Sequence, residues 1–127
     1  RIHMLDSMIT QKMKFLTAIA AVLALVIYFS ISYSNSLHRK TIGKMISQGA
    51  LIVDVRTPAE FSSGHFNGAI NIPLGDIEKK LSLLDGKYDP IIVYCRTGNR
   101  SSKAKRILER HGFTRVFNCG GLNDMQK

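Results

Sequence analysis

The 127-residue chain is poor in cysteine, and its two cysteines, Cys95 and Cys119, are too few for a disulfide-stabilised scaffold. Neither belongs to a Cys-x-x-Cys pair or has a second sulfur or an imidazole at zinc-ligand spacing. We therefore expect no metal and no cofactor. The sequence also shows no internal repeat, and its 45% hydrophobic residues suit one small domain with an additional apolar segment.

Acidic residues are scarce as well, since nine Asp and Glu oppose eighteen Lys and Arg, for a net charge of +9. Such a surplus is compatible with binding to nucleic acid or to an anionic membrane surface. The chain contains no Trp, however, and the basic residues are scattered except in residues 103–106, with no interleaved aromatic side chains. We discount nucleic acid as a partner and interpret residues 103–106 as part of a solvated helix face.

Residues 15–31 lack charge altogether and are mostly apolar, and they follow Lys12 and Lys14. A uniformly apolar run of this kind argues against a buried core helix and predicts a membrane partner. As a transmembrane helix it is at the lower limit of the ~17 to 25 residues that span a bilayer. As a signal peptide it lacks an Ala-x-Ala cleavage site, so both interpretations stay open. The short basic start favours export of the following domain from the cytoplasm.

The flanking segments complete the expected organisation. Residues 1–12 begin without a methionine and show no periodicity, so we interpret them as a tag or a disordered N-terminus. Residues 13–36 contain the signal or transmembrane segment and a serine-rich linker. Residues 37–127 form the folded domain.

Within the domain, apolar periodicity and turn residues predict alternating helices and strands. The expected helices are residues 37–48, 58–63, 76–84, 101–111 and 121 to the end, and the expected strands are 50–55, 69–72, 90–94 and 115–118. A capping box formed by Thr57 and Glu60, with Pro58 at the first helical position, marks the second helix. The alternation predicts an α/β fold with a mostly parallel sheet covered on both faces, whose ligand binds beyond the carboxyl ends of the strands.

The strand at 90–94 leads directly into seven residues that indicate chemistry: Cys95, Arg96, Thr97, Gly98, Asn99, Arg100 and Ser101. Gly98 permits a positive φ, and a tight loop that enters a helix N-terminus directs several backbone N–H groups to one point. A thiol at that point ionises below the ~8.5 of a free cysteine. An inert buried cysteine is the alternative, but two arginines would not follow it. We predict a nucleophilic Cys95, with Arg96 and Arg100 holding an anionic substrate or leaving group.

Four residues separate Cys95 from Arg100, and a loop of that size closes around roughly one sulfur atom. It resembles the active-site loop of the rhodanese (sulfurtransferase) family, whereas cysteine phosphatases of the Cdc25 type have five residues between cysteine and arginine. Residues 51–56, 64–74 and 120–122 are similar to recurring segments of that family, in the same order. Within the family, the chain resembles the single-domain periplasmic type called phage shock protein E.

This resemblance implies a three-layer rhodanese-like fold and a thiosulfate sulfurtransferase. Sulfane sulfur would pass from thiosulfate or a similar anionic donor, through a Cys95 persulfide, to cyanide or a thiol acceptor. Residues 96–101 would bind the substrate. The resemblance and the apolar segment place the protein in a bacterial inner membrane with the domain facing the periplasm, or in the periplasm after signal cleavage. Alternatives are a membrane-tethered, non-catalytic binding module and, less favoured, a cysteine phosphatase or arsenate reductase.

Other residues are expected to support the site. Asp54 lies at the carboxyl edge of the first strand, and an ion pair between Arg56 and either Asp54 or Glu60 is favoured over a direct chemical role. Residues 64–70, which include His65, resemble a structural corner of the rhodanese fold, so a structural role for His65 is favoured over that of a general base. If the last strand lies beside the strand of Cys95, as in rhodaneses, Cys119 becomes a hypothetical resolving thiol for the persulfide. A small residue filling a turn is the favoured alternative.

Overall fold

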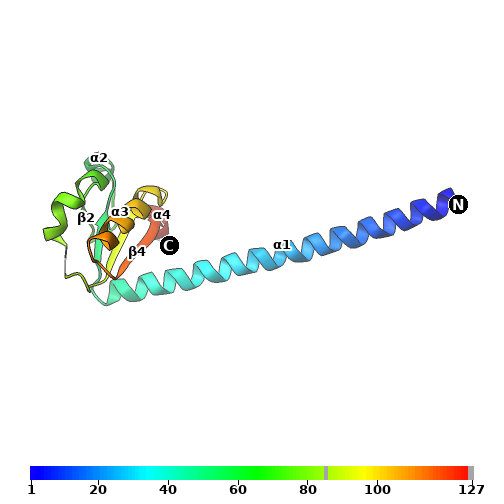
Figure 1. The fold of residues 1–127 in the computed structure, drawn as a ribbon, viewed down its shortest axis with the longest axis horizontal. Coiled ribbons are helices and arrows are strands. Elements are labelled where there is room, and N and C mark those ends of the chain that lie inside the picture. The colour runs from blue at the N-terminus through cyan, green and yellow to red at the C-terminus, as the bar shows by residue number, and fades with distance from the viewer. Residues whose placement is uncertain (85, 126–127) are drawn as a thin grey trace. The chain divides into compact units, whose positions relative to one another are not determined.

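The computed structural model describes residues 1–84 and 86–125, and within them the strands form one four-stranded sheet in the order β2-β1-β3-β4 (Figure 1). The strands are β1 (Leu51–Asp54), β2 (Ile70–Asn71), β3 (Ile91–Cys95) and β4 (Val116–Gly121). Every pairing is parallel, as the alternation of helices and strands predicts. The carboxyl ends of β1, β3 and β4 therefore meet at one edge of the sheet, where the Cys95 loop begins.

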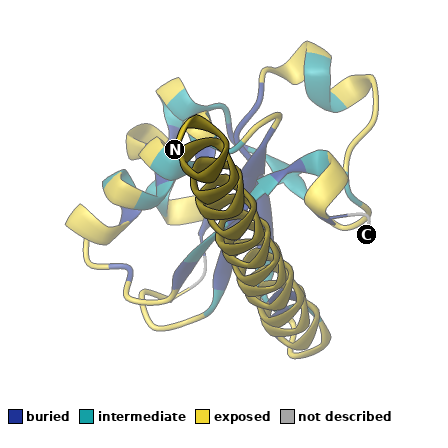
Figure 2. Ribbon diagram, turned by 90° about the vertical axis from the view of Figure 1, so that its right-hand side faces the viewer, coloured by how far each residue is buried: buried dark blue, intermediate teal, exposed yellow. Residues whose placement is uncertain are grey.

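The remaining elements are α1 (Ile2–Ser47), α2 (Pro58–Ser62), the 3₁₀ turns η1 (Leu74–Asp76) and η2 (Glu78–Leu83), α3 (Asn99–Arg110) and α4 (Leu122–Met125). Alternate strand residues face opposite sides of the sheet. Val53, Val93 and Cys95 join a core cluster that contains Leu108 of α3. Ile52, Tyr94 and Cys119 join a second cluster with the end of α1 and with α4. Figure 2 shows that the central strands of the sheet contain most of the buried residues. The expected three-layer arrangement is confirmed.

The N-terminal region differs from the expectation, because residues 2–47 form one continuous helix. The sequence predicts a tag or a disordered start over residues 1–12, an apolar span, a linker and a separate helix from residue 37. The serine-rich linker contains neither proline nor glycine, so nothing in it interrupts a helix. The last turns of α1 bury Ile42 and Met45 in the domain, and Gly49, with φ +82°, follows the helix.

Within the described residues, α1 is the one helix long and apolar enough to cross a membrane. None of its apolar window is buried, which fits either a transmembrane anchor or a signal sequence. The chain divides after Lys40 into an N-terminal helical unit and the domain that starts at Thr41. The domain is the unit that carries the Cys95 loop.

Three further elements depart from the prediction. The expected helix at 76–84 consists of η1 and η2, since Lys80 has non-helical dihedral angles and short connectors often adopt 3₁₀ turns. α3 begins two residues early, because Gly98 is its N-cap. β4 continues to Gly121 with a bulge at Cys119, because Val93 pairs with Asn118 and Tyr94 with Gly120. Residues 126–127 of the expected terminal helix lie outside the described residues.

Candidate active site

The Cys95 thiol lies at the end of β3 and faces the start of α3. The Gly98 N–H donates to Cys95 Sγ over 3.0 Å. This contact needs the left-handed backbone of Gly98, whose φ of +99° is unfavourable for other residues. A Cβ atom at position 98 would also lie 3.3 Å from the Gly120 Cα atom. The predicted turn at Gly98 is therefore present, and it points an amide at the sulfur.

Ser101 supplies a second donor to the thiol. Its hydroxyl lies 3.4 Å from Cys95 Sγ and 3.1 Å from the Gly98 carbonyl oxygen. The side chain is completely buried, so its geometry is fixed by these partners and by the Gly120 carbonyl, at 3.5 Å. Ser101 thus connects the sulfur, the loop and β4.

These donors determine the ionisation of Cys95. Burial raises the pKa of the thiol, but the Ser101 hydroxyl and the backbone N–H groups of Ser101, Gly98 and Thr97 outweigh it, so that the pKa falls from 9.0 to about 7. Hydrogen bonds to the charged form stabilise the thiolate against the cost of desolvation. The geometry therefore supports an ionised thiol near neutral pH, as the loop sequence predicts.

The two loop arginines differ in their surroundings. Arg100 makes a two-pronged ion pair with Glu60 of α2, with N–O distances of 2.7 and 2.9 Å. Its guanidinium holds the pKa of the Glu60 carboxyl well below its usual range. Glu60 raises the pKa of Arg100, and the nearby charge of Cys95 raises it further. The sequence predicts that Arg100 holds an anionic substrate or leaving group, and the structure shows its guanidinium already paired with Glu60.

Arg96 is exposed and, within the described part of the chain, pairs with no acidic side chain. It borders an open cavity of about 350 Å³, whose other lining residues are Arg56, Glu60, Ser63, Leu122 and Asn123. The Arg96 carbonyl oxygen would lie 2.4 Å from a Cβ atom at Gly121, so β4 approaches the loop closely enough to require glycine there. Thr97 and Asn99 are exposed on the same loop.

Asp54 and Arg56 form a buried ion pair, and Arg56 also lines this cavity. Arg56 Nη2 lies 2.7 Å from Asp54 Oδ2, and the Arg56 backbone N–H donates to Asp54 Oδ1 over 2.9 Å. Arg56 also donates to the Gly64 carbonyl and lies 5.8 Å from the centre of the Tyr94 ring. The ion-pair interpretation of Asp54 is confirmed, while Glu60 pairs with Arg100 instead of Arg56.

His65 and Cys119 are separate from the sulfur site. The His65 ring stacks on Phe61 at 3.7 Å, and its Nδ1 atom lies 2.9 Å from the Phe61 carbonyl oxygen, which fits the structural corner that we expected. Cys119 lies within β4 instead of after it, and its side chain belongs to the core cluster on the opposite face of the sheet from Cys95. Both thiols are free. This placement disfavours a Cys95–Cys119 disulfide.

The sequence reasoning missed the ion pair between Glu60 and Arg100. The capping box fixes Glu60 at the start of α2, and the structure contains both of its hydrogen bonds. The partner is 40 residues away, however, and no local pattern indicates it. Among the residues that the structure describes, no group of three or more His, Cys, Asp or Glu could hold a metal ion.

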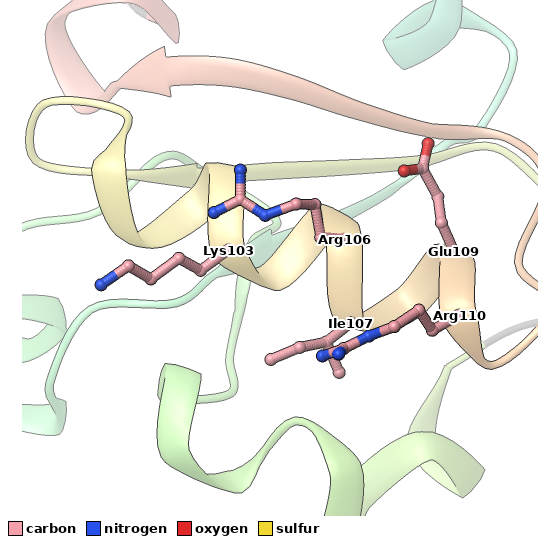
Figure 3. Close-up of a pocket in the computed structure, with 5 residues that line it drawn as sticks. All are labelled: Lys103, Arg106, Ile107, Glu109 and Arg110. Carbon is pink, nitrogen blue, oxygen red and sulfur yellow. The ribbon is translucent and has the colours of Figure 1, made fainter.

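A second cavity, of about 700 Å³, lies on the exposed side of α3 (Figure 3). It is lined by Lys103, Arg106, Ile107, Glu109 and Arg110. None of these side chains is a thiol, and Arg106 donates to Ser102 of the same helix. The Cys95 loop is the better candidate for chemistry, although this cavity is larger than the one beside Arg96.

The domain is similar to known proteins over most of its length. The model of the Rhodanese-like domain family matches residues 38–127. Thiosulfate sulfurtransferase PspE of Escherichia coli (strain K12) is 42% identical over 74 residues, which covers 58% of this chain and 71% of that protein. The putative sulfur carrier protein YrkF of Bacillus subtilis (strain 168) is 39% identical over 74 residues, 58% of this chain but only 40% of that protein.

Two solved structures share the fold. A rhodanese with anions from E. coli superposes with a TM-score of 0.57 at 40% identity, and the match covers 60% of this chain and 91% of that one. The human single-domain sulfurtransferase TSTD1 gives a TM-score of 0.61 at 24% identity, and the match covers 68% of this chain and 90% of that one.

Proposed function

The chain belongs to the rhodanese-like domain family, and from this premise we propose that it is a thiosulfate sulfurtransferase with Cys95 as its nucleophile. The observation that carries the proposal is the position of the Cys95 thiol, 3.0 Å from the Gly98 N–H nitrogen and 3.4 Å from the Ser101 hydroxyl. These donors lower the pKa of the thiol to about 7. An ionised thiol near neutral pH is the form that attacks sulfur.

In the first half-reaction, the Cys95 thiolate attacks the outer sulfur of thiosulfate. The new bond joins the two sulfur atoms, the bond to the sulfonate group breaks, and sulfite leaves with the electron pair. The persulfide keeps one negative charge on its terminal sulfur. The loop amides are directed at the inner sulfur in the free protein, and we propose that residues 96–101 surround the added sulfur as well, since preorganised donors contribute about 3 kcal/mol each in comparable sites.

In the second half-reaction, an acceptor attacks the terminal sulfur and the Cys95 thiolate leaves. Cyanide gives thiocyanate, and a thiolate acceptor gives a new persulfide. The low pKa of Cys95 favours this step because it makes the thiolate a good leaving group. Two separate half-reactions imply ping-pong kinetics.

Arg96 is proposed to bind the anionic donor, because it is exposed beside the loop and has no acidic partner among the described residues. We predict that Arg96→Ala raises the KM for thiosulfate about tenfold and changes kcat by less than about threefold. Steady-state kinetics with varied thiosulfate at saturating cyanide would measure both. A large fall in kcat at an unchanged KM would contradict a binding role.

The proposal as a whole is tested by intact-mass analysis of the full chain with and without thiosulfate, coupled to measurement of thiocyanate. We expect Cys95 to gain one sulfur atom and then to lose it to cyanide. A chain that gains no sulfur would instead be the non-catalytic binding module, and hydrolysis of an aryl phosphate would indicate the phosphatase alternative.

We further propose that residues 15–31 of α1 anchor the protein in a bacterial inner membrane. The sulfurtransferase domain, residues 37–127, would then lie in the periplasm. The exposed, uncharged character of this part of the helix supports the tether. Sedimentation of the full chain with membranes after a carbonate wash would support it. Recovery of a shortened, soluble chain would indicate cleavage of a signal peptide instead.

A further inference from the structure

We propose that Glu60 sets the charge of the sulfur donor that the site accepts. By neutralising Arg100, it reduces the electrostatic advantage of the thiosulfate dianion over singly charged sulfane-sulfur donors, such as organic thiosulfonates, so that the site accepts both. This inference rests on the proposed function, since it concerns the donor half-reaction at Cys95.

The first support is the geometry of the Glu60 carboxylate. Both of its oxygens accept from the Arg100 guanidinium, at 2.7 and 2.9 Å. The oxygen at 2.7 Å also accepts from the Thr57 backbone N–H at 2.9 Å and from the Thr57 hydroxyl at 3.0 Å. Because the N-terminal turn of α2 fixes Glu60, the carboxylate is a permanent partner that an incoming anion has to compete with.

The second support is the charge that remains around the loop. Arg56 is matched by the buried Asp54 carboxylate, and Arg100 is matched by Glu60. Arg96 is therefore the one loop cation without an acidic partner in the described residues, and the ionised Cys95 thiolate opposes it. A donor with two negative charges then enters a loop with no surplus of positive charge, whereas a donor with one charge is less disfavoured.

The third support is the position of Arg100 between two anions. Its guanidinium donates hydrogen bonds to Glu60, and the nearby charge of the Cys95 sulfur also raises its pKa. The side chains of the pair are about one-third exposed, at 33% for Arg100 and 31% for Glu60, so a donor can approach them from solvent. Removing the Glu60 charge would release the full charge of Arg100 to the donor and to the thiolate.

The test compares two donors that deliver the same sulfur. Thiosulfate carries two charges and releases sulfite, while methanethiosulfonate carries one and releases methanesulfinate, and both leave the same Cys95 persulfide. In the full chain, Glu60→Gln keeps the side-chain length and can still accept from Thr57. We expect it to raise the ratio of kcat/KM for thiosulfate to that for methanethiosulfonate about tenfold.

Glu109→Gln is the matched control, because Glu109 pairs with Lys105 on the same helix but away from the sulfur. Its donor ratio should equal that of the wild type. Arg100→Gln is a second, independent variant that should change the donor ratio in the opposite direction. It leaves the Glu60 charge unmatched, so the ratio should fall about tenfold. This variant keeps the proposal testable even if Glu60→Gln fails to fold.

A ratio that stays within about twofold of the wild type in the variants that fold would overturn the role of Glu60. The outcome is separable from the proposed function, because mass analysis reports sulfur on Cys95 whatever the donor ratio. Absence of sulfur on wild-type Cys95 with either donor would reject the sulfurtransferase itself.

Discussion

The two cysteines occupy similar places in the fold and have opposite chemistry. Both are free and almost fully buried, with 1% of Cys95 and 5% of Cys119 exposed, and they lie toward the carboxyl ends of the neighbouring strands β3 and β4. The pKa of Cys95 is lowered to about 7. That of Cys119 is raised to about 11, first by burial and then by the charge of Asp124. Burial alone therefore does not decide whether a thiol is inert.

What separates the two thiols is the supply of donors. Cys95 ends a strand whose next turn folds back through Gly98, so that amides and the Ser101 hydroxyl point at the sulfur. Cys119 is the bulged residue of a strand, and its side chain enters an apolar cluster with Tyr94 and Met125. A loop that runs into a helix N-terminus offers backbone N–H groups that have no partner within the helix, whereas the N–H groups of a strand are hydrogen-bonded to the neighbouring strand.

The sharpest way to break this comparison is to replace each sulfur in turn. Cys95→Ser should abolish sulfur loading from thiosulfate, because serine cannot form the persulfide. Cys119→Ser should load sulfur at a rate within about twofold of the wild type, since that thiol contacts another core cluster. Intact-mass analysis after thiosulfate treatment measures both. Sulfur loading on Cys95→Ser, or no sulfur loading on a folded Cys119→Ser, would show that the two thiols do not differ in the way assigned here.

The pH dependence of alkylation sharpens the comparison next. A lowered pKa means that Cys95 is about half ionised at pH 7, so its iodoacetamide rate should rise with a midpoint near pH 7 and level off above pH 8. Because its pKa is raised, Cys119 should react only slowly there, with a rate still rising toward pH 11. Peptide mapping separates the two sites. Equal midpoints for the two thiols would show that the loop donors do not act on Cys95.

Ser101→Ala tests one of those donors. Loss of the hydroxyl removes the 3.4 Å contact to Cys95 Sγ and should raise the alkylation midpoint by about one pH unit, because a hydrogen bond to a charged group contributes about 1.5 kcal/mol or more. The expected rate at pH 7 falls about fivefold. Ser102→Ala is the control, since the Ser102 hydroxyl contacts Arg106 instead. An unchanged midpoint in Ser101→Ala would assign the ionisation to the backbone alone.

Much of this site could be predicted from the sequence because its information is local. The spacing from Cys95 to Arg100, the turn at Gly98 and the following helix are contained in a few consecutive residues, and the structure places them as predicted. The sequence indicates Glu60 as a cap of α2 and as an alternative partner of Arg56. Its pairing with Arg100 depends on how α2 and α3 meet in the folded domain, which no local pattern shows.

The same limit explains the errors at Cys119 and in the N-terminal region. Gly120 and Gly121 look like a turn in the sequence, but they continue β4 because the bulge and the close approach to Arg96 require small residues. The serines before residue 37 predict a linker, but helix α1 continues through them because no glycine or proline follows immediately.

The smallest expected effect concerns Asp124, the second cause of the raised pKa of Cys119. The Asp124 carboxylate accepts the Gly121 N–H at 2.8 Å, a bond that an asparagine carbonyl can keep. Asp124→Asn should lower the Cys119 pKa by roughly half a unit, because burial is the larger cause and remains. In a Cys95→Ser background, the alkylation rate at pH 9.5 should therefore rise about threefold. A fall of the midpoint to that of a free cysteine would show that charge, and not burial, keeps Cys119 protonated, and the contrast between the two thiols would then rest on electrostatics alone.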